Sequence, residues 1–273
     1  MRGEWIGWRL AAVIVVAIVV TASLMMWQAA LERPHDDVVL HGGTSVQAPV
    51  DEIVAAFQRR TGIRVYRYHG PSDQLLEHLT TAREAAGLFL PGDPFYLDRA
   101  QEVGLVEQTE VVAWLVPAIL VPQGNPQGIE SLADFARPHL RLAMADPRFP
   151  AEGCRTRALG RIMPSLLERH GLTVDDIEPN VVVTAASGHE LGNAVVLGHV
   201  DGAVLWEPVA RSYSPAEVVT IPAETNLALP LKAGLLGHAR ENSAARAFLE
   251  FLGSATAREI LQTHHYTLAW DAD

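Results

Sequence analysis

Apolar and polar positions alternate along this chain in short blocks, and their period switches between that of a strand and that of a helix. Val38-Val39-Leu40 is an apolar run of the kind found in a buried strand. From Val46 to Arg60 the apolar side chains recur every three or four residues, which predicts a helix, and Gly62 follows where a glycine commonly ends one. Repeated strand-helix succession predicts an α/β fold with mainly parallel sheets flanked by helices.

The same succession continues to the end of the chain. The predicted strands after the first are residues 64–68, 88–90, 111–121, 141–144, 181–184, 202–206 and 227–236. The predicted helices after the first begin near Ser72, Asp93, Arg155, Gly188, Ser243 and Ser254. We expect Pro164 to kink or divide the helix over 155–169, because proline removes a backbone donor and clashes with the preceding turn.

Turn and capping residues mark the boundaries between these elements. Asp93-Pro94 predicts an N-cap followed by proline in the first helical turn. Ser131-Leu-Ala-Asp134 matches a capping box with Asp in the place of Glu. Pro117 interrupts the long apolar run 111–121 and a Pro/Gly-rich turn follows at 122–128. We therefore place a crossing between two lobes there.

The first 35 residues have the pattern of an export or membrane segment. Arg2 and Arg9 flank a short polar start, and Leu10 to Trp27 is mostly apolar. A run of this length just spans a hydrocarbon core, and it also follows the charged-then-apolar order of a signal peptide. Bulky Trp27-Gln28 make a poor cleavage site, which favours an uncleaved inner-membrane anchor over 10–27. Either alternative predicts a periplasmic or other extracytoplasmic protein.

Composition narrows the class of protein. The chain has 273 residues, of which 49% are hydrophobic and 19% charged, enough for a large core in two lobes. The formal net charge is −11 and there is no long basic run, so nucleic acid is excluded as a partner. Cys154 is the single cysteine, so no intrachain disulfide can form.

Signatures of enzymes and metal sites are missing from the sequence. No nucleophile elbow, zinc-protease helix, paired Cys-x-x-Cys or phosphate loop occurs. Cys154, His189 and Glu207 are the remaining candidates for catalysis, and no spacing relates them. His264-His265 lacks a nearby ligand pattern and fits a solvated surface better than a metal site. We therefore expect no catalytic residue, no metal cation and no cofactor, and an enzyme is the less favoured alternative.

Two predicted strands end in small-residue turns that deliver hydroxyl groups to a helix. The first carries Thr44 and Ser45, and the second carries Gly70-Pro71-Ser72. The first N–H groups of a helix lack intrahelical partners and carry partial positive charge, so two such ends form a site for an oxyanion. Each hydroxyl also has a simpler explanation as an N-cap, and Thr44 stays closer to that explanation.

The order of these and later motifs resembles the molybdate-binding proteins of ABC transporters, over about Val38 to Leu268. The motifs that carry the resemblance are Thr44-Ser45, Phe57-x4-Gly62, Gly70-Pro71-Ser72, Asp146-Pro147 with Pro150-x-x-Gly153, Gly198-x-x-Asp201-Gly-x-Val-x-Trp206, and the closing segment 245–254.

The resemblance implies a type II periplasmic-binding fold of two lobes that close on a ligand. Residues 36–118 and 222–273 would form lobe I, and 119–221 lobe II. It further implies a monomer that captures a tetrahedral oxyanion, molybdate or tungstate, and hands it to ABC permease and ATPase subunits. The alternative is a membrane-tethered sensory or interaction domain of the same fold that binds a different small ligand.

Carried over position by position, the family's ligand-binding groups fall on serines in lobe I and on backbone and ring donors in lobe II. Trp206 stands where the family has a tyrosine, and it offers an indole N–H in place of a hydroxyl. Trp206 fits a core position equally well. The predicted ligand-binding residues are Thr44, Ser45, Ser72, Glu152, Gly153, Gly188 and Trp206.

Overall fold

The computed structural model describes residues 37–81, 87–145, 157–185 and 187–270, and the statements below concern these residues. The chain divides into two units, residues 1–36 and 37–273. The first unit holds the predicted signal or anchor segment, which therefore lies outside the described residues. Within the described part, no helix combines the length and the apolar character needed to cross a membrane.

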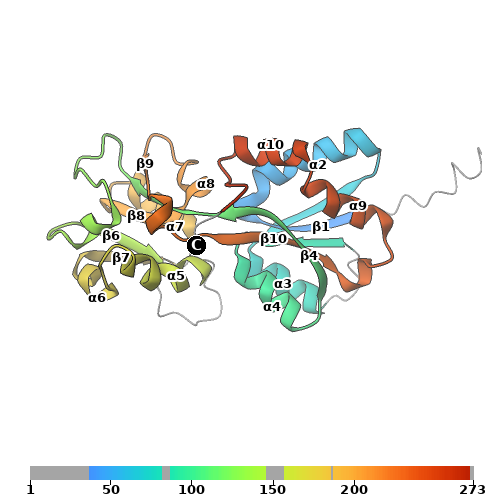
Figure 1. The fold of residues 1–273 in the computed structure, drawn as a ribbon, viewed down its shortest axis with the longest axis horizontal. Coiled ribbons are helices and arrows are strands. Elements are labelled where there is room, and N and C mark those ends of the chain that lie inside the picture. The colour runs from blue at the N-terminus through green and yellow to red at the C-terminus, as the bar shows by residue number, and fades with distance from the viewer. Residues whose placement is uncertain (1–36, 82–86, 146–156, 186, 271–273) are drawn as a thin grey trace, which may run out of the picture. The chain divides into compact units, whose positions relative to one another are not determined.

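Two five-stranded sheets form the framework of the second unit (Figure 1). The first sheet has the order β2-β1-β3-β10-β4. Its strands are β1 Val38–Gly43, β2 Val65–Gly70, β3 Gly87–Leu90, β4 Val106–Leu115 and β10 Leu229–Leu236. The second sheet has the order β7-β6-β8-β5-β9. Its strands are β5 Pro117–Val121, β6 Leu142–Ala145, β7 Val181–Ala185, β8 Gly202–Trp206 and β9 Glu217–Thr220.

Both sheets are mixed, which corrects the expectation of mainly parallel sheets. In the first sheet β1 pairs parallel with β2 and β3, while β10 pairs antiparallel with β3 and β4. In the second sheet β6 pairs parallel with β7 and β8, while β5 pairs antiparallel with β8 and β9. The antiparallel pairs involve the strands next to the crossings between sheets, which the strand-helix pattern alone does not orient.

Helices cover the sheets and connect their parallel strands. The α-helices are α2 Gln47–Thr61, α3 Ser72–Thr81, α4 Pro94–Glu102, α5 Arg157–Glu168, α6 Val174–Ile177, α7 Gly188–Val196, α8 Glu207–Ala210, α9 Ser243–Leu252 and α10 Ala255–Thr263. Short 3-10 turns are η1 Thr44–Val46, η2 Leu132–Ala136, η3 Glu178–Asn180, η4 Ala223–Thr225 and η5 Gly237–Ala239. Pro164 lies inside α5 without dividing it, so that division was a wrong prediction.

Strand β3 of the first sheet is buried on both faces. Leu88 and Leu90 of β3 pack into the cluster that includes α2 and α9, whereas Phe89 between them packs toward α3 and α4. Figure 1 shows α2, α9 and α10 on one side of this sheet and α3 and α4 on the other. Phe57 of α2 meets Phe248 of α9 edge to face, with ring centroids 5.0 Å apart. The unbroken apolar run of β3 follows from this double burial.

The chain crosses between the sheets twice, and the two crossings are adjacent. The first lies between β4 and β5 at Val116, and the second lies between β9 and β10. Leu115 pairs with Leu229, so the segments run side by side through the middle of the unit (Figure 1). The predicted lobe boundaries at 118/119 and 221/222 stay a prediction, and the strands divide between the sheets near these positions.

Asn226 ties the two crossings together from a fully buried position. Its Nδ2 donates to the carbonyl oxygens of Pro117 (2.9 Å) and Ile221 (3.3 Å). The backbone carbonyl oxygen of Asn226 accepts from the Arg169 guanidinium (2.7 Å). A buried amide with these partners stabilises one arrangement of the crossings, because each partner left unpaired would cost free energy.

The predicted caps occur as expected. The Asp93 side chain accepts from the Phe95 N–H at 2.9 Å, with Pro94 in the first turn of α4. Gly62 ends α2 in the left-handed conformation, with φ of 74°. The Ser131–Asp134 capping box is present, although it opens the 3-10 turn η2 rather than an α-helix.

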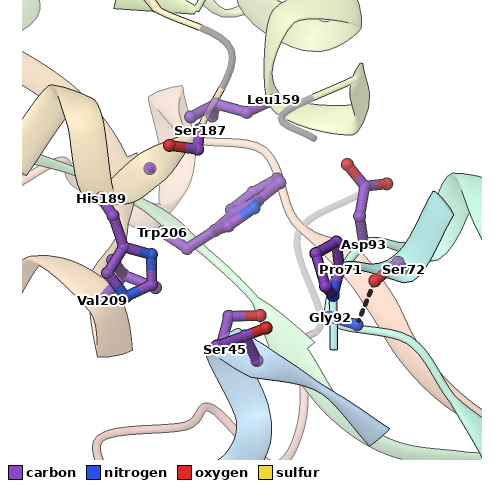
Figure 2. Close-up of a pocket in the computed structure, with 12 residues that line it drawn as sticks. Ser45, Pro71, Ser72, Gly92, Asp93, Leu159, Ser187, His189, Trp206 and Val209 are labelled. Carbon is purple, nitrogen blue, oxygen red and sulfur yellow. Dashed lines mark hydrogen bonds between the residues drawn. The ribbon is translucent and has the colours of Figure 1, made fainter. Parts of the chain in front are cut away.

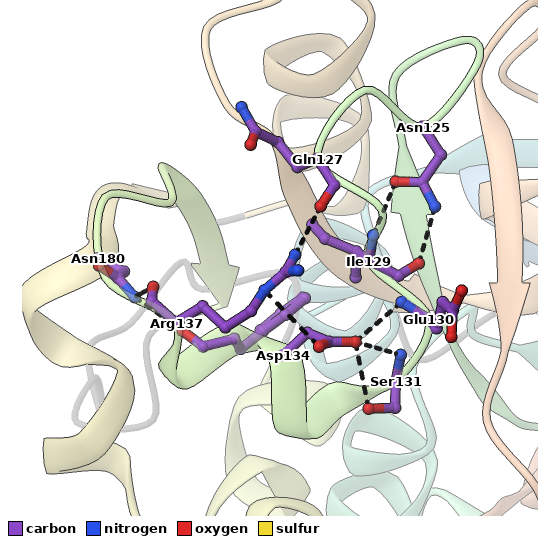
Figure 3. Close-up of polar contacts among 9 residues, drawn as sticks. Asn125, Gln127, Ile129, Glu130, Ser131, Asp134, Arg137 and Asn180 are labelled. Atoms are coloured by element: carbon purple, nitrogen blue, oxygen red, sulfur yellow. Dashed lines mark hydrogen bonds and ion pairs between the residues drawn. The ribbon is translucent and has the colours of Figure 1, made fainter.

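Polar contacts within one sequence segment hold the long connection after β5 (Figure 3). Asn125 exchanges two side-chain hydrogen bonds with the backbone of Ile129, at 2.9 and 3.0 Å. The Asp134 carboxylate accepts from the N–H groups of Glu130 and Ser131, both at 2.9 Å. Burial raises the pKa of Asp134, but these bonds and Arg137 outweigh it and leave the pKa below its usual value.

Asp201, one of the motif residues, stabilises the second sheet. Its carboxylate is almost fully buried and accepts from the Arg141 backbone N–H (2.8 Å) and guanidinium (2.7 Å) at the start of β6. Burial raises the pKa of Asp201, and the stronger combined effect of the Arg141 bonds lowers it overall. Asp201 therefore fixes the beginnings of β6 and β8 relative to each other.

His41 on β1 is a buried imidazole whose two ring nitrogens have no hydrogen-bond partner within the described part of the chain. It stacks on Tyr68 with centroids 5.5 Å apart, and the ring of His78 lies 6.0 Å away. Burial, helped by His78, lowers the pKa of His41 from 6.5 to about 4. His41 is therefore neutral in the folded protein at neutral pH.

Replacing Asn226 by Ala should lower the free energy of unfolding by about 2–3 kcal/mol, because it removes buried bonds between the crossings. Urea unfolding followed by tryptophan fluorescence measures this. The matched control is Asn193→Ala on the exposed face of α7, expected to change stability by less than about 0.5 kcal/mol. Equal effects of the two substitutions would contradict the role given to Asn226.

The free energy of unfolding should fall as the pH is lowered from about 6.5 to about 4, because of the low pKa of His41. In this window the unfolded chain binds a proton that the folded protein does not, so the loss grows with acidification, to about 3 kcal/mol at its lower end. His41→Phe should remove this part of the pH dependence, measured by urea unfolding at several pH values. Exposed His199→Gln is the control, and a slope that is the same in wild type and His41→Phe would refute the assignment.

Candidate functional site

A pocket of about 300 Å³, here called the central pocket, lies where strand ends from both sheets meet (Figure 2). From the first sheet's side it is lined by residues that follow β1, β2 and β3. From the second sheet's side it is lined by α5, by α7 and by the end of β8. Its described lining residues are Thr44, Ser45, Pro71, Ser72, Gly92, Asp93, Leu159, Ser187, Gly188, His189, Trp206 and Val209.

The beginnings of five helices converge on the central pocket. They are η1 leading into α2, α3, α4, α5 and α7, each contributing a lining residue from or next to its first turn. The N–H groups of these first turns have no partner within their helices and give this region partial positive charge. None of the described lining residues is Lys or Arg. The donors that the described lining offers are therefore uncharged, and Asp93 is its one carboxylate.

The turn after β1 packs closely against the turn after β3, and the close approach depends on glycines in both turns. A Cβ added at Gly92 would collide with the Ser45 Oγ, and one added at Gly43 would collide with the Gly92 backbone. The Tyr266 hydroxyl donates to the Ser45 carbonyl at 3.2 Å from the C-terminal segment. Burial raises the pKa of Tyr266, so its hydroxyl stays protonated and remains a donor. These contacts fix Ser45 at the pocket wall.

Ser72 makes a contact that the sequence did not reveal. Its buried Oγ accepts a hydrogen bond from the Gly92 N–H at 3.1 Å, shown dashed in Figure 2. A hydroxyl that accepts in this way still has its own proton to donate. In the described structure no side chain caps η1 or α2. Simple capping therefore does not account for Thr44 and Ser45.

The opposite wall is built by α7 and the end of β8. The Ser187 Oγ caps α7 by accepting from the Glu190 N–H at 3.2 Å, and Gly188 is the first helical residue. Trp206 is 6% exposed, and in Figure 2 its indole lies across the pocket between Ser187 and Pro71. Trp206 thus combines the two roles that its position in the sequence left open, because it packs in the core and also lines the pocket.

Five of the seven predicted ligand-binding residues line the central pocket, namely Thr44, Ser45, Ser72, Gly188 and Trp206. That they bind a ligand stays a prediction. The other two, Glu152 and Gly153, lie outside the described residues, as does Cys154.

Of the candidates for catalysis, His189 is exposed at the pocket wall, and Glu207 pairs with Arg211 at 2.7 Å without lining the pocket. His264 contacts Glu52 at 2.8 Å, and the described residues hold no group of three metal-ligating side chains.

Sequence reasoning missed the wall that follows β3. Gly92 and Asp93 line the pocket, although Asp93 was expected only to cap α4. The signal was available, because residues 88–90 form the third parallel strand and its carboxyl end lies at the same edge as those of β1 and β2. Leu159, Ser187 and Val209 were also missed.

A second hollow of about 510 Å³, the outer hollow, shares Thr44, Ser45, His189 and Val209 with the central pocket. The polar side chains in its remaining walls include Gln47, Asp51, Ser212 and His264. The two hollows therefore adjoin along the first turn and α7.

Comparisons with known proteins agree with this architecture. A putative binding protein of Haemophilus influenzae is 27% identical over 169 residues, which are 62% of this chain and 65% of that protein, slightly under two thirds. The molybdate-binding protein ModA of Mycobacterium tuberculosis is 24% identical over 229 residues, 82% of each chain. This relative confirms the resemblance found in the sequence.

A crystal structure of PEB3, a Campylobacter jejuni protein, with bound L-phospholactate has the same fold. It superimposes with a TM-score of 0.72 at 17% identity, over 85% of this chain and all of that one. Residues 38–267 match the model of a family described as bacterial extracellular solute-binding protein. This match, together with the two sheets and the pocket at the strand ends, shows that the chain belongs to the bacterial extracellular solute-binding proteins.

Proposed function

We propose that this protein captures a tetrahedral oxyanion, molybdate or tungstate, in the central pocket for uptake by an ABC transporter. The observation that carries the proposal is the convergence of five helix starts and the hydroxyls of Ser45 and Ser72 on a pocket whose described lining holds no Lys or Arg. The relative from M. tuberculosis, named as molybdate-binding, supports the choice of ligand.

The energetics favour many weak donors acting together. A hydrogen bond to a charged group contributes about 1.5–3 kcal/mol, and a helix start about 0.3–2 kcal/mol. A dianion taken out of water therefore needs several donors at once. Ser45, Ser72 and the first N–H groups of α3 and α7 provide such a set on two sides of the pocket.

The proposed function also implies a location outside the cytoplasm and partner subunits in the membrane. It acts outside the cytoplasm, carried there by a signal or anchor at residues 10–27, and delivers its solute to permease and ATPase subunits as a monomer. It catalyses no reaction and uses no cofactor. Membership of the extracellular solute-binding family supports the location and the transport role.

A second candidate ligand is a phosphorylated small organic acid. The outer hollow adjoins the central pocket and offers polar walls at Gln47 and Ser212, which gives room for an organic tail beyond an oxyanion group. The PEB3 structure with bound L-phospholactate supports this candidate.

Calorimetric titration of the full-length protein with molybdate, tungstate, sulfate, phosphate and phospholactate distinguishes these ligands. We expect tungstate and molybdate to bind at least tenfold more tightly than sulfate. Tighter binding of phospholactate would favour the second candidate. If none of the five binds more tightly than millimolar, the oxyanion proposal is wrong.

Ser45→Ala and Ser72→Ala should each weaken tungstate binding about tenfold, since each removes one hydrogen bond to a charged group. Calorimetry measures the change. Ser254→Ala is the control, because Ser254 caps α10 and does not line the pocket. It should lower stability and leave affinity unchanged. Full affinity in both pocket variants would place the site elsewhere.

Gly92→Ala should abolish tungstate binding, because the added methyl group would displace the Ser45 hydroxyl. The matched control is Gly70→Ala at the end of β2, where an added Cβ meets only the Leu75 side chain, at 3.6 Å. Circular dichroism checks that both variants fold. A folded Gly92→Ala protein that binds as wild type would show that the spacing of these turns does not matter.

A further inference from the structure

Asp93 is a buried carboxylate that joins elements of the two sheets. It follows β3 at the central pocket and is 3% exposed. Its Oδ1 accepts from the Phe95 N–H at 2.9 Å, which caps α4 beside the first sheet. Its Oδ2 accepts from the Ala158 N–H at 3.0 Å, in the first turn of α5 beside the second sheet. Each oxygen thus serves a different helix.

Both bonds belong to the stronger class of hydrogen bond. An N–H in the first turn of a helix has no intrahelical acceptor, and a carboxylate placed there also meets the positive end of the helix dipole. Charge-assisted bonds of this kind are about twice as strong as neutral ones. In Figure 2 the Asp93 carboxylate points toward the α5 side, where Leu159 lines the pocket.

We infer that Asp93 is a positioning residue that fastens the start of α5 to the first-sheet wall of the central pocket and thereby holds the two walls together around the solute. The part that concerns the solute rests on the proposed function. Because Asp93 accepts from one N–H at the start of α4 and one at the start of α5, these two N–H groups are not available to a solute.

The substitution Asp93→Asn should keep one of the two hydrogen bonds and remove the other. The amide oxygen can still accept from Phe95 and cap α4, whereas the NH₂ group can only donate and cannot accept from Ala158. Hydrogen exchange of the ligand-free protein should show the Ala158 amide exchanging at least tenfold faster, with the Phe95 amide unchanged. Tungstate should bind about tenfold more weakly, with the difference in the dissociation rate.

Asp93→Ser is the second variant, because a serine hydroxyl can cap a helix, as Ser187 does here, but is too short to serve two helices. It should give the same exchange pattern if the asparagine variant fails to fold. Asp98→Asn on the same helix is the control, since it removes an exposed carboxylate that pairs with Lys232 at 3.6 Å outside the central pocket. It should behave as wild type.

Unchanged exchange at Ala158, or equal loss of protection at Phe95, would overturn the inference, since Asp93 would then act only within α4. Tighter tungstate binding by Asp93→Asn would also overturn it, because the carboxylate would then act on the solute mainly by repulsion. If no oxyanion binds the wild type, the proposed function fails while the exchange pattern still decides whether Asp93 joins the two walls.

Discussion

The first N–H groups of a helix must find acceptors outside that helix, and the organisation of this protein depends on that requirement. Parallel strands that each lead into a helix place all of these unsatisfied groups at one edge of a sheet. Here two sheets turn such edges toward the same pocket. Some of the groups are satisfied internally, by Ser187 on α7 and by Asp93 on α4 and α5. The remaining N–H groups are the donors that the proposed function assigns to an anionic solute.

The sheets are mixed because the chain must pass between them. β4 and β10 pair along their whole length, and Asn226 joins the ends of both crossings from inside the core. The two halves of the pocket are therefore connected in two ways. The crossings connect them through the backbone, and Asp93 connects them through a side chain that lines the central pocket.

Much of the fold could be predicted from the sequence, because local signals there agree with tertiary structure. The strand over 202–206 was predicted with the bounds that the structure has, and the helix predicted to begin near Ser243 begins at that residue. Strand direction near the crossings was not predictable, since it depends on partners distant in sequence. Pro164 does not divide α5, although proline is disfavoured inside a helix.

The candidate site was predictable to the extent that its residues follow strands with a recognisable turn. Ser45 and Ser72 were found in this way, whereas Trp206 came from the family resemblance; all three line the central pocket. Gly92 and Asp93 were missed because their roles depend on contacts with Ser72 and Ala158, 20 and 65 residues away along the chain. No local pattern encodes such contacts. A buried capping carboxylate looks the same in sequence whether it serves one helix or two.

The contacts among Gly43, Gly92, Ser45 and Ser72 also affect how quickly a solute can be taken up. Since the three turns interlock through backbone and hydroxyl atoms, this half of the pocket needs little ordering when a solute arrives. The entropic cost of binding then falls mainly on the other half. If the pocket takes up a solute as proposed, the interlocked turns meet it as a preformed surface, and the adjustment on binding falls mainly on the wall built by α7 and the end of β8.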